Sequence, residues 1–277
     1  MDLKALNNTP PWDWPADTAE TLVSVLRDKQ AAEPDRVLAT EMAGDFTVVN
    51  EELVEALLAV LRCGDESEGL RGRAAISLGP ILEYADTEGF EDAGDVPISE
   101  RTFRRIQGSL RELHTDAQIP REVRRRILEA SVRAPQDWHE NAIRSAYASG
   151  DDTWKLTAVF CMRFVRGFDG QIVEELDNRD TAIELEAVLA AGNWGLEAAW
   201  PHVAALIHSG QTPKPLLLAA IEAVPSIRPQ EASGVLSNLT ESDDEDIVEA
   251  VHEALAAAEE TYLEDEDEDE GDDLFLQ

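Results

Sequence analysis

A ten-residue pattern recurs seven times along this chain of 277 residues, and it constrains the fold more than any other feature. The copies read DRVLATEMAG from Asp35, LRGRAAISLG from Leu70, VRRRILEASV from Val123, WKLTAVFCMR from Trp154, IELEAVLAAG from Ile183, LLLAAIEAVP from Leu216 and IVEAVHEALA from Ile247. Their successive starts are separated by 35, 53, 31, 29, 33 and 31 residues. Repetition at a period of about 30 residues predicts an array of similar structural units.

Within each copy, the first, fifth and eighth positions share one face of a helix, because steps of four and three residues follow the helical period. The fifth positions are Ala39, Ala74, Ile127, Ala158, Ala187, Ala220 and Val251. The eighth positions are Met42, Ser77, Ala130, Cys161, Ala190, Ala223 and Ala254. Small side chains at these positions allow a second helix to approach closely. A glycine or proline at position ten can bend or end the helix.

A second apolar-periodic segment precedes most copies. Examples are residues 51–62, 101–113, 139–148 and 200–208. Each unit is therefore predicted to be two antiparallel helices, too small to bury its own apolar face. Stacking the units buries these faces, as in a solenoid. Alanine and leucine dominate the apolar residues and favour helices, so we predict an all-α fold.

The repeated pattern resembles the HEAT repeat family, and especially its short variant in bilin-lyase-like proteins. LRGRAAISLG and IELEAVLAAG carry the resemblance best, while Asp35 and Trp154 stand where an aliphatic residue is usual. The resemblance implies a right-handed α-solenoid of about seven antiparallel helix pairs. Its motif is a packing motif, so it implies a fold and a binding surface but transfers no catalytic residues.

Four parts of the chain are predicted: a cap over residues 1–16, a solenoid over 17–260, an acidic inserted loop at about 84–98 and a disordered acidic tail over 261–277. The cap contains Trp12 and Trp14, which we expect to fold back over the first repeat, because the end of a solenoid must be covered. The tail ends in Leu274, Phe275 and Leu276, a candidate peptide motif for a groove in a partner.

The formal charge of −35 repels phosphate and anionic lipid, so we expect neither nucleic acid nor a membrane as a partner. No stretch approaches the roughly 18 apolar residues of a membrane helix. The first residues contain no apolar signal segment either. These features favour a cytoplasmic protein.

Residues 101–133 go against this composition, since they contain nine arginines and only four acidic residues. Arg101, Arg104 and Arg105 share one face of the first helix of their repeat. Arg121, Arg124 and Arg125 share a face of the second helix. Three interpretations are open: a ladder of salt bridges to neighbouring repeats, a docking site for an acidic partner or an anion, or arginines on the helix surface without a special role.

Catalytic motifs are missing: the chain has no nucleophile elbow, phosphate-binding loop, dinucleotide fingerprint or zinc-binding H-E-x-x-H sequence. We therefore predict no catalytic or metal-binding residues and no cofactor. The predicted function is a non-catalytic scaffold or adaptor that binds another protein in the solenoid groove, with the arginines as an anchor. The alternative is a bilin-lyase-like or other ligand-handling enzyme of the HEAT family.

The register of the repeat can be tested at Ala187, a fifth position. A leucine in this place should overpack the contact with the neighbouring helix and lower the free energy of unfolding by about 1–3 kcal/mol. Urea denaturation of Ala187→Leu measures this change. An unchanged midpoint would mean that the register is wrong.

Overall fold

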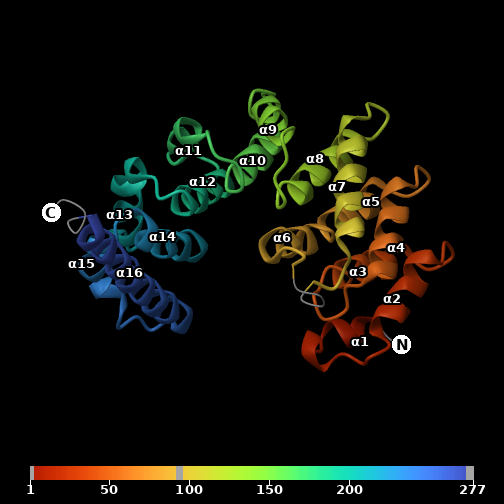
Figure 1. Ribbon diagram of the computed structural model, residues 1–277, viewed down its shortest axis with the longest axis horizontal. Helices are drawn as coiled ribbons and strands as arrows, with labels where there is room; N and C mark the ends of the chain where they lie inside the picture. Colours follow the sequence, from red (N-terminus) through yellow and green to blue (C-terminus); the bar gives the residue numbers. More distant parts are fainter. Residues whose placement is uncertain (1–2, 92–95, 273–277) are drawn as a thin grey trace. The chain divides into compact units, whose positions relative to one another are not determined.

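The computed structural model describes residues 3–91 and 96–272, with the surroundings of side chains described through Glu260. All regular secondary structure in these residues is helical (Figure 1). The chain divides into two compact units, Met1–Ala142 and Ile143–Gln277. Among the described residues, no helix is both long enough and apolar enough to cross a lipid bilayer.

Unit 1 contains α1 (Leu3–Asn7), η1 (Pro11–Asp13), α2 (Thr18–Arg27), α3 (Glu33–Met42), α4 (Glu51–Arg62), α5 (Glu68–Ile76), α6 (Gly79–Glu88), α7 (Glu100–Thr115) and α8 (Arg121–Ser131). The helix α9 (His139–Tyr147) spans the boundary between the units. Unit 2 continues with α10 (Asp152–Cys161), α11 (Asp169–Glu175), α12 (Thr181–Asn193), η2 (Glu197–Ala199), α13 (Trp200–His208), α14 (Lys214–Ile227), η3 (Pro229–Glu231), α15 (Ala232–Leu236), η4 (Ser237–Leu239) and α16 (Glu245–Asp272).

Sequential helices pack in pairs, and the pairs stack. In unit 1, α4 contacts α5 and α7 contacts α8. The second helix of each pair also contacts the second helix of the next pair, so α3 packs on α5 and α5 packs on α8. In unit 2, α10, α12, α14 and α16 form the corresponding series. Short connections between contacting helices make each pair antiparallel. The predicted all-α, HEAT-like arrangement is confirmed within each unit.

The repeat register is also confirmed. All seven fifth positions have no exposed surface, and all seven eighth positions are at most 6% exposed. Asp35 and Trp154, the two residues that depart from the motif at position one, are only half-buried. The helical period therefore selects the buried face correctly in every copy.

Glycine at position ten does more than end a helix, because it allows two second helices to touch. A Cβ atom added to Gly192 of α12 would lie 2.9 Å from the Cβ atom of Ala223 on α14. One added to Gly44 would lie 3.2 Å from the Cα atom of Ser77. Ala223 and Ser77 are the eighth positions of the copies that follow. The tenth position of one repeat thus packs on the eighth position of another.

The inserted segment is only partly a loop. The sequence places an acidic loop at about 84–98, but residues 84–88 belong to α6. Gly79 begins this additional helix, and Pro80 in its first turn fits a helix start because its missing N–H is not needed there. The long spacing between two copies therefore reflects an additional helix, and residues 92–95 of the predicted loop lie outside the described residues.

Trp12 and Trp14 have different environments at the N-terminus. Trp14 packs against the core, and its Nε1 atom donates hydrogen bonds to the carbonyl oxygens of Leu6 and Thr9, at 3.1 and 2.9 Å. Trp12 is 78% exposed, so the prediction that it covers the first repeat is wrong. Leu3 and Leu6 of α1 are buried in its place, and α1 contacts α3.

The helix α16 continues beyond the predicted end of the folded region. The sequence begins a disordered tail at residue 261, whereas the helical backbone extends through Asp272. Glutamate is a good helix former, and the segment contains no proline. The predicted motif Leu274, Phe275 and Leu276 lies outside the described residues.

Two glycine substitutions test the contact between second helices. Gly192→Ala should lower the free energy of unfolding by about 1–3 kcal/mol, because its new Cβ atom would lie 2.9 Å from the Cβ atom and 3.0 Å from the Cα atom of Ala223. The matched control is Gly108→Ala in the interior of α7, where an added Cβ atom has nothing within 4 Å. This control should raise stability by about 0.5–1 kcal/mol through helix propensity. Equal effects in urea denaturation would contradict the proposed packing.

Candidate functional site at the arginine cluster

The six arginines predicted to bind a partner lie on α7 and α8, within unit 1. Antiparallel packing separates them into two groups. The C-terminal end of α7 meets the first turns of α8, where the Nδ1 atom of His114 lies 3.1 Å from the carbonyl oxygen of Arg124. Arg104 precedes His114 by ten residues, or about 15 Å along the helix. The structure therefore does not bring the six side chains into one patch.

The group at the start of α7 is exposed. Arg101 and Arg104 are exposed, and a guanidinium nitrogen of Arg104 lies 3.3 Å from a carboxylate oxygen of Glu100 on the same helix. Arg105 forms an ion pair with Glu55 of α4, so it joins neighbouring repeats. The start of α7 is held further by Glu51 of α4, whose carboxylate accepts hydrogen bonds from the backbone N–H of Ser99, at 2.7 Å, and from the Thr102 hydroxyl.

The charges on α8 are largely balanced on the helix itself. Arg125 is 5% exposed, and its guanidinium donates hydrogen bonds to Glu122 and Glu129, each at 2.6 Å. Arg126 bonds to the same two carboxylates, at 3.1 and 2.8 Å. The hydrogen bond from Arg125 lowers the pKa of Glu122, although burial opposes the shift. These two arginines therefore form the local part of a salt-bridge network.

The two remaining residues of the predicted group on α8 are Arg121 and Arg124. The side chain of Arg121 is exposed, whereas Arg124 is half-buried. The Nε atom of Arg124 is buried without a hydrogen-bond partner in the described structure. Arg121 is thus the residue of this group that is most accessible to a partner.

A shallow groove between α5 and α8 adds arginines that the sequence analysis did not select. It encloses about 250 Å³, and its lining includes Gly72, Arg73, Ile76, Glu122 and Arg126. A Cβ atom on Gly72 would lie 3.1 Å from the Cγ atom of Arg126, so the arginine stem lies across this glycine. The groove lies between α5 and α8, which are far apart in the sequence. The spacing of residues in the sequence does not show that these two helices lie side by side.

Two buried arginines were also missed, although the repeat contains a signal for them. Arg36 and Arg71 occupy position two of their copies. Arg36 donates to the carbonyl oxygen of Leu26, at 3.0 Å, and Arg71 donates to that of Leu61, at 2.9 Å. Both carbonyls lie in the last turn of the preceding helix, where cations are favoured. In the first two copies, the arginine at position two therefore caps the preceding helix and has a structural role.

Beside the arginine cluster, His114, Trp138 and His139 form an aromatic stack. The ring centroid of Trp138 lies 5.0 Å from that of His114 and 3.9 Å from that of His139. His139 is fully buried, and its Nδ1 atom accepts a hydrogen bond from the backbone N–H of Gln136, at 2.8 Å. Burial, helped by the nearby charge of His114, lowers the pKa of His139 to about 4.

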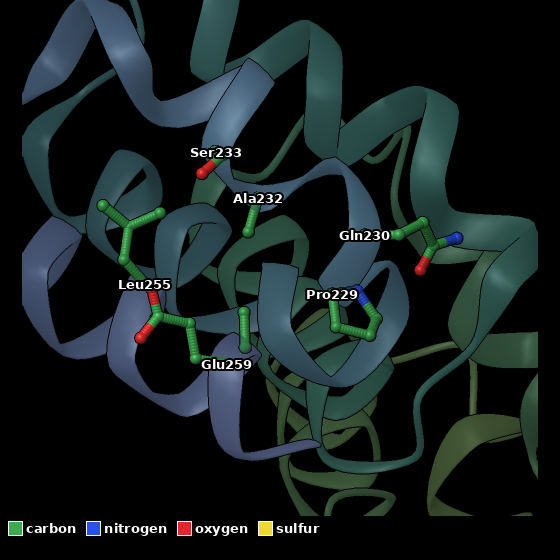
Figure 2. A pocket seen from close by; sticks show the side chains of 7 residues that line it. Pro229, Gln230, Ala232, Ser233, Leu255 and Glu259 are labelled. Carbon is green, nitrogen blue, oxygen red and sulfur yellow. The ribbon is translucent and has the colours of Figure 1, made fainter. Parts of the chain in front are cut away.

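Unit 2 carries its hollows near α16. One of them encloses about 570 Å³. Its lining includes Pro229, Ala232, Leu255 and Glu259 (Figure 2). A second hollow of about 360 Å³ lies between α14 and α16. Within the described residues, no three histidine, cysteine or acidic side chains are grouped so that they could hold a metal ion.

No protein-family model and no curated protein matches this chain. Among solved structures, it is similar to human deoxyhypusine hydroxylase in complex with glycerol, with a TM-score of 0.41 and 16% identity over 94% of this chain and 96% of that one. It is also similar to an engineered protein, with a TM-score of 0.36 and 19% identity over 88% of this chain and 97% of that one. These distant likenesses carry no inference about activity.

The buried His139 should make unit 1 sensitive to acid. Its pKa is about 4 in the folded protein and about 6.5 in the unfolded chain, so the unfolded state binds more protons between these values. The stability from this residue is therefore complete above pH 6.5 and decreases as the pH falls toward 4. We expect a loss of about 2–3 kcal/mol between pH 7 and pH 4.5.

The measurement compares unfolding at both pH values for the parent protein and for His139→Gln. The variant should lose less stability on acidification than the parent does. His252→Gln replaces an exposed histidine and is the matched control. An identical pH dependence in the parent and in His139→Gln would contradict the assignment.

Proposed function

We propose that this chain is a non-catalytic interaction module, a scaffold or adaptor that holds a partner protein on its stacked helices. Repeat arrays present long surfaces built from equivalent faces of successive helices, and such surfaces hold extended or helical segments. The partner that unit 1 fits is a protein segment rich in acidic residues. The anchor for this segment is the arginine cluster.

The observation that carries the proposal is the exposed pair Arg101 and Arg104 at the start of α7. These cations stand out in a chain with a formal charge of −35. The bond between Arg104 and Glu100 joins side chains that are 69% and 59% exposed, so it contributes at most about 1 kcal/mol. A carboxylate of a partner can therefore replace Glu100 at little cost.

Contacts between α7 and α4 support this anchor indirectly. Arg105 ties α7 to α4 through Glu55, and Glu51 binds the first turn of α7. A helix held in this way fixes the backbone that carries its exposed arginines, which lowers the backbone entropy lost on binding. Arg121 offers a further exposed contact at the opposite end of the α7–α8 pair.

The test is affinity capture from an extract of the source cells at native salt, followed by measurement with the purified partner. We expect Arg101→Glu combined with Arg104→Glu to weaken binding at least about tenfold, because two attractive contacts become repulsive. The matched control reverses two exposed cations elsewhere, Lys29→Glu with Arg179→Glu. This control should bind within about twofold of the parent.

Equal affinity of the two double variants would contradict the anchor. A partner without an acidic segment at the interface would contradict the proposed recognition. A small ligand that co-purifies with the chain and is chemically altered by it would favour the ligand-handling enzyme instead.

A further inference from the structure

The hollow between α14 and α16 combines an apolar floor with an acidic rim. Leu218 and Pro225 of α14 and Ala250 of α16 contribute to the floor. Glu222, Glu249 and Glu253 stand on the rim. The enclosed volume of about 360 Å³ is enough for one or two large side chains of a partner. Both helices belong to unit 2.

The three rim glutamates are not neutralised by any side chain that the structure describes. In the described part of the protein, none of them forms an ion pair or a hydrogen bond with another side chain. The nearby cation Lys214 is already bonded to Asp244 and Asp246, at 2.7 and 2.6 Å. Glu249 and Glu253 are also four residues apart on one helix, where like charges repel each other. A cation placed over the rim would relieve this repulsion.

The apolar floor continues along the second helices of unit 2. In each repeat, the third and seventh positions line this face, as Leu218 and Glu222 do in the hollow. The corresponding residues are Leu156 and Phe160 on α10, and Leu185 and Leu189 on α12. All four are half-buried rather than enclosed. Since α10, α12, α14 and α16 contact one another in series, these side chains occupy equivalent positions on adjacent helices, and we call this row of positions the stripe.

We propose that this surface, defined by the stripe and the α14–α16 hollow, binds a basic amphipathic helix of another protein. Leucine-like side chains of that helix would fill the hollow, and its lysines or arginines would pair with Glu222, Glu249 and Glu253. The helix-in-groove mode uses apolar anchors at helical spacing on one face. Charge complementarity selects a basic segment, since an acidic one would face three unpaired carboxylates.

This surface is separate from the arginine cluster in unit 1, and it selects a partner of the opposite charge. Either proposal can therefore be contradicted by experiment without affecting the other. The binding of an acidic segment to α7 can fail while the groove in unit 2 still binds a basic helix, and the reverse also holds.

The probe is a fluorescent peptide of about 15 residues, made of leucine and lysine with the leucines on one helical face. Fluorescence anisotropy at near-physiological salt measures its binding to the full chain. Two control peptides accompany it. One has the same composition in an order that destroys the apolar face, and the other has glutamate in place of lysine. Only the amphipathic lysine peptide should bind tightly.

The decisive variant is Glu222→Lys combined with Glu253→Lys, which should weaken binding of the lysine peptide at least about tenfold. The matched control, Glu231→Lys with Glu241→Lys, changes the net charge equally at exposed residues that do not line the hollow. It should stay within about twofold of the parent. Circular dichroism checks that both variants remain folded.

Several outcomes would overturn the proposal. One is absence of binding by the lysine peptide. Another is an equal loss of affinity in both double variants, which would indicate attraction by net charge alone. Equal binding of the rearranged peptide would also count against a groove. A dimer in sedimentation that the Glu222 and Glu253 changes dissolve would also overturn it, because a second copy of the chain would then cover this surface.

Discussion

The structure depends on the close approach of successive second helices. This approach is possible because small residues meet at the crossing, as Gly192 meets Ala223 and Gly44 meets Ser77. A repeat of about 30 residues buries too little surface to be stable alone, so the contact between repeats supplies the missing burial. The apolar interior of each unit is a series of such contacts, with side chains from the first helices filling the space beside them.

Much of this packing could be predicted from the sequence, because the helical period is a local property. The fifth and eighth positions are buried in every copy, including Ile127 and Val251, which are larger than the usual alanine. The role of the glycines depends on residues outside the repeated pattern. Nothing within LRGRAAISLG indicates that Gly79 begins a new helix, because that depends on Pro80 and on the space left by α8.

The candidate site was predicted less well than the fold, for the same reason. The sequence identifies an excess of arginine but cannot assign each guanidinium to a carboxylate. The pairs of Arg105 with Glu55 and Arg133 with Glu83 join residues 50 positions apart, and such pairs follow only from tertiary packing. The burial of Arg125 likewise depends on the helices beside it. The groove in unit 2 was missed because its acidic rim could not be distinguished from the many other glutamates of the chain.

The charges of the two units have different consequences. In unit 1, several arginines on the stacked helices bind carboxylates of neighbouring repeats, so part of the ionic network serves the fold, whereas Arg101, Arg104 and Arg121 of the α7–α8 pair are exposed. In unit 2, three carboxylates beside an apolar hollow remain unpaired among the described residues. Different positions of the same repeat therefore have different roles: some pack the helices together, and others form the proposed binding surface. The fifth, eighth and tenth positions hold the helices together, and in α10, α12, α14 and α16 the third and seventh positions are half-buried or exposed.

The central claim is that repeats are joined by direct contact between the tenth and eighth positions. A double-mutant cycle at Gly192 and Ala223 tests it most directly, since Ala223→Gly removes the Cβ atom that an alanine at position 192 would meet at 2.9 Å and leaves the contact with the Cα atom, at 3.0 Å. The free energy of unfolding is measured for the parent, both single variants and the double variant. We predict that Gly192→Ala costs at most about half as much in the Ala223→Gly background as in the parent. The same cost in both backgrounds would contradict the claim.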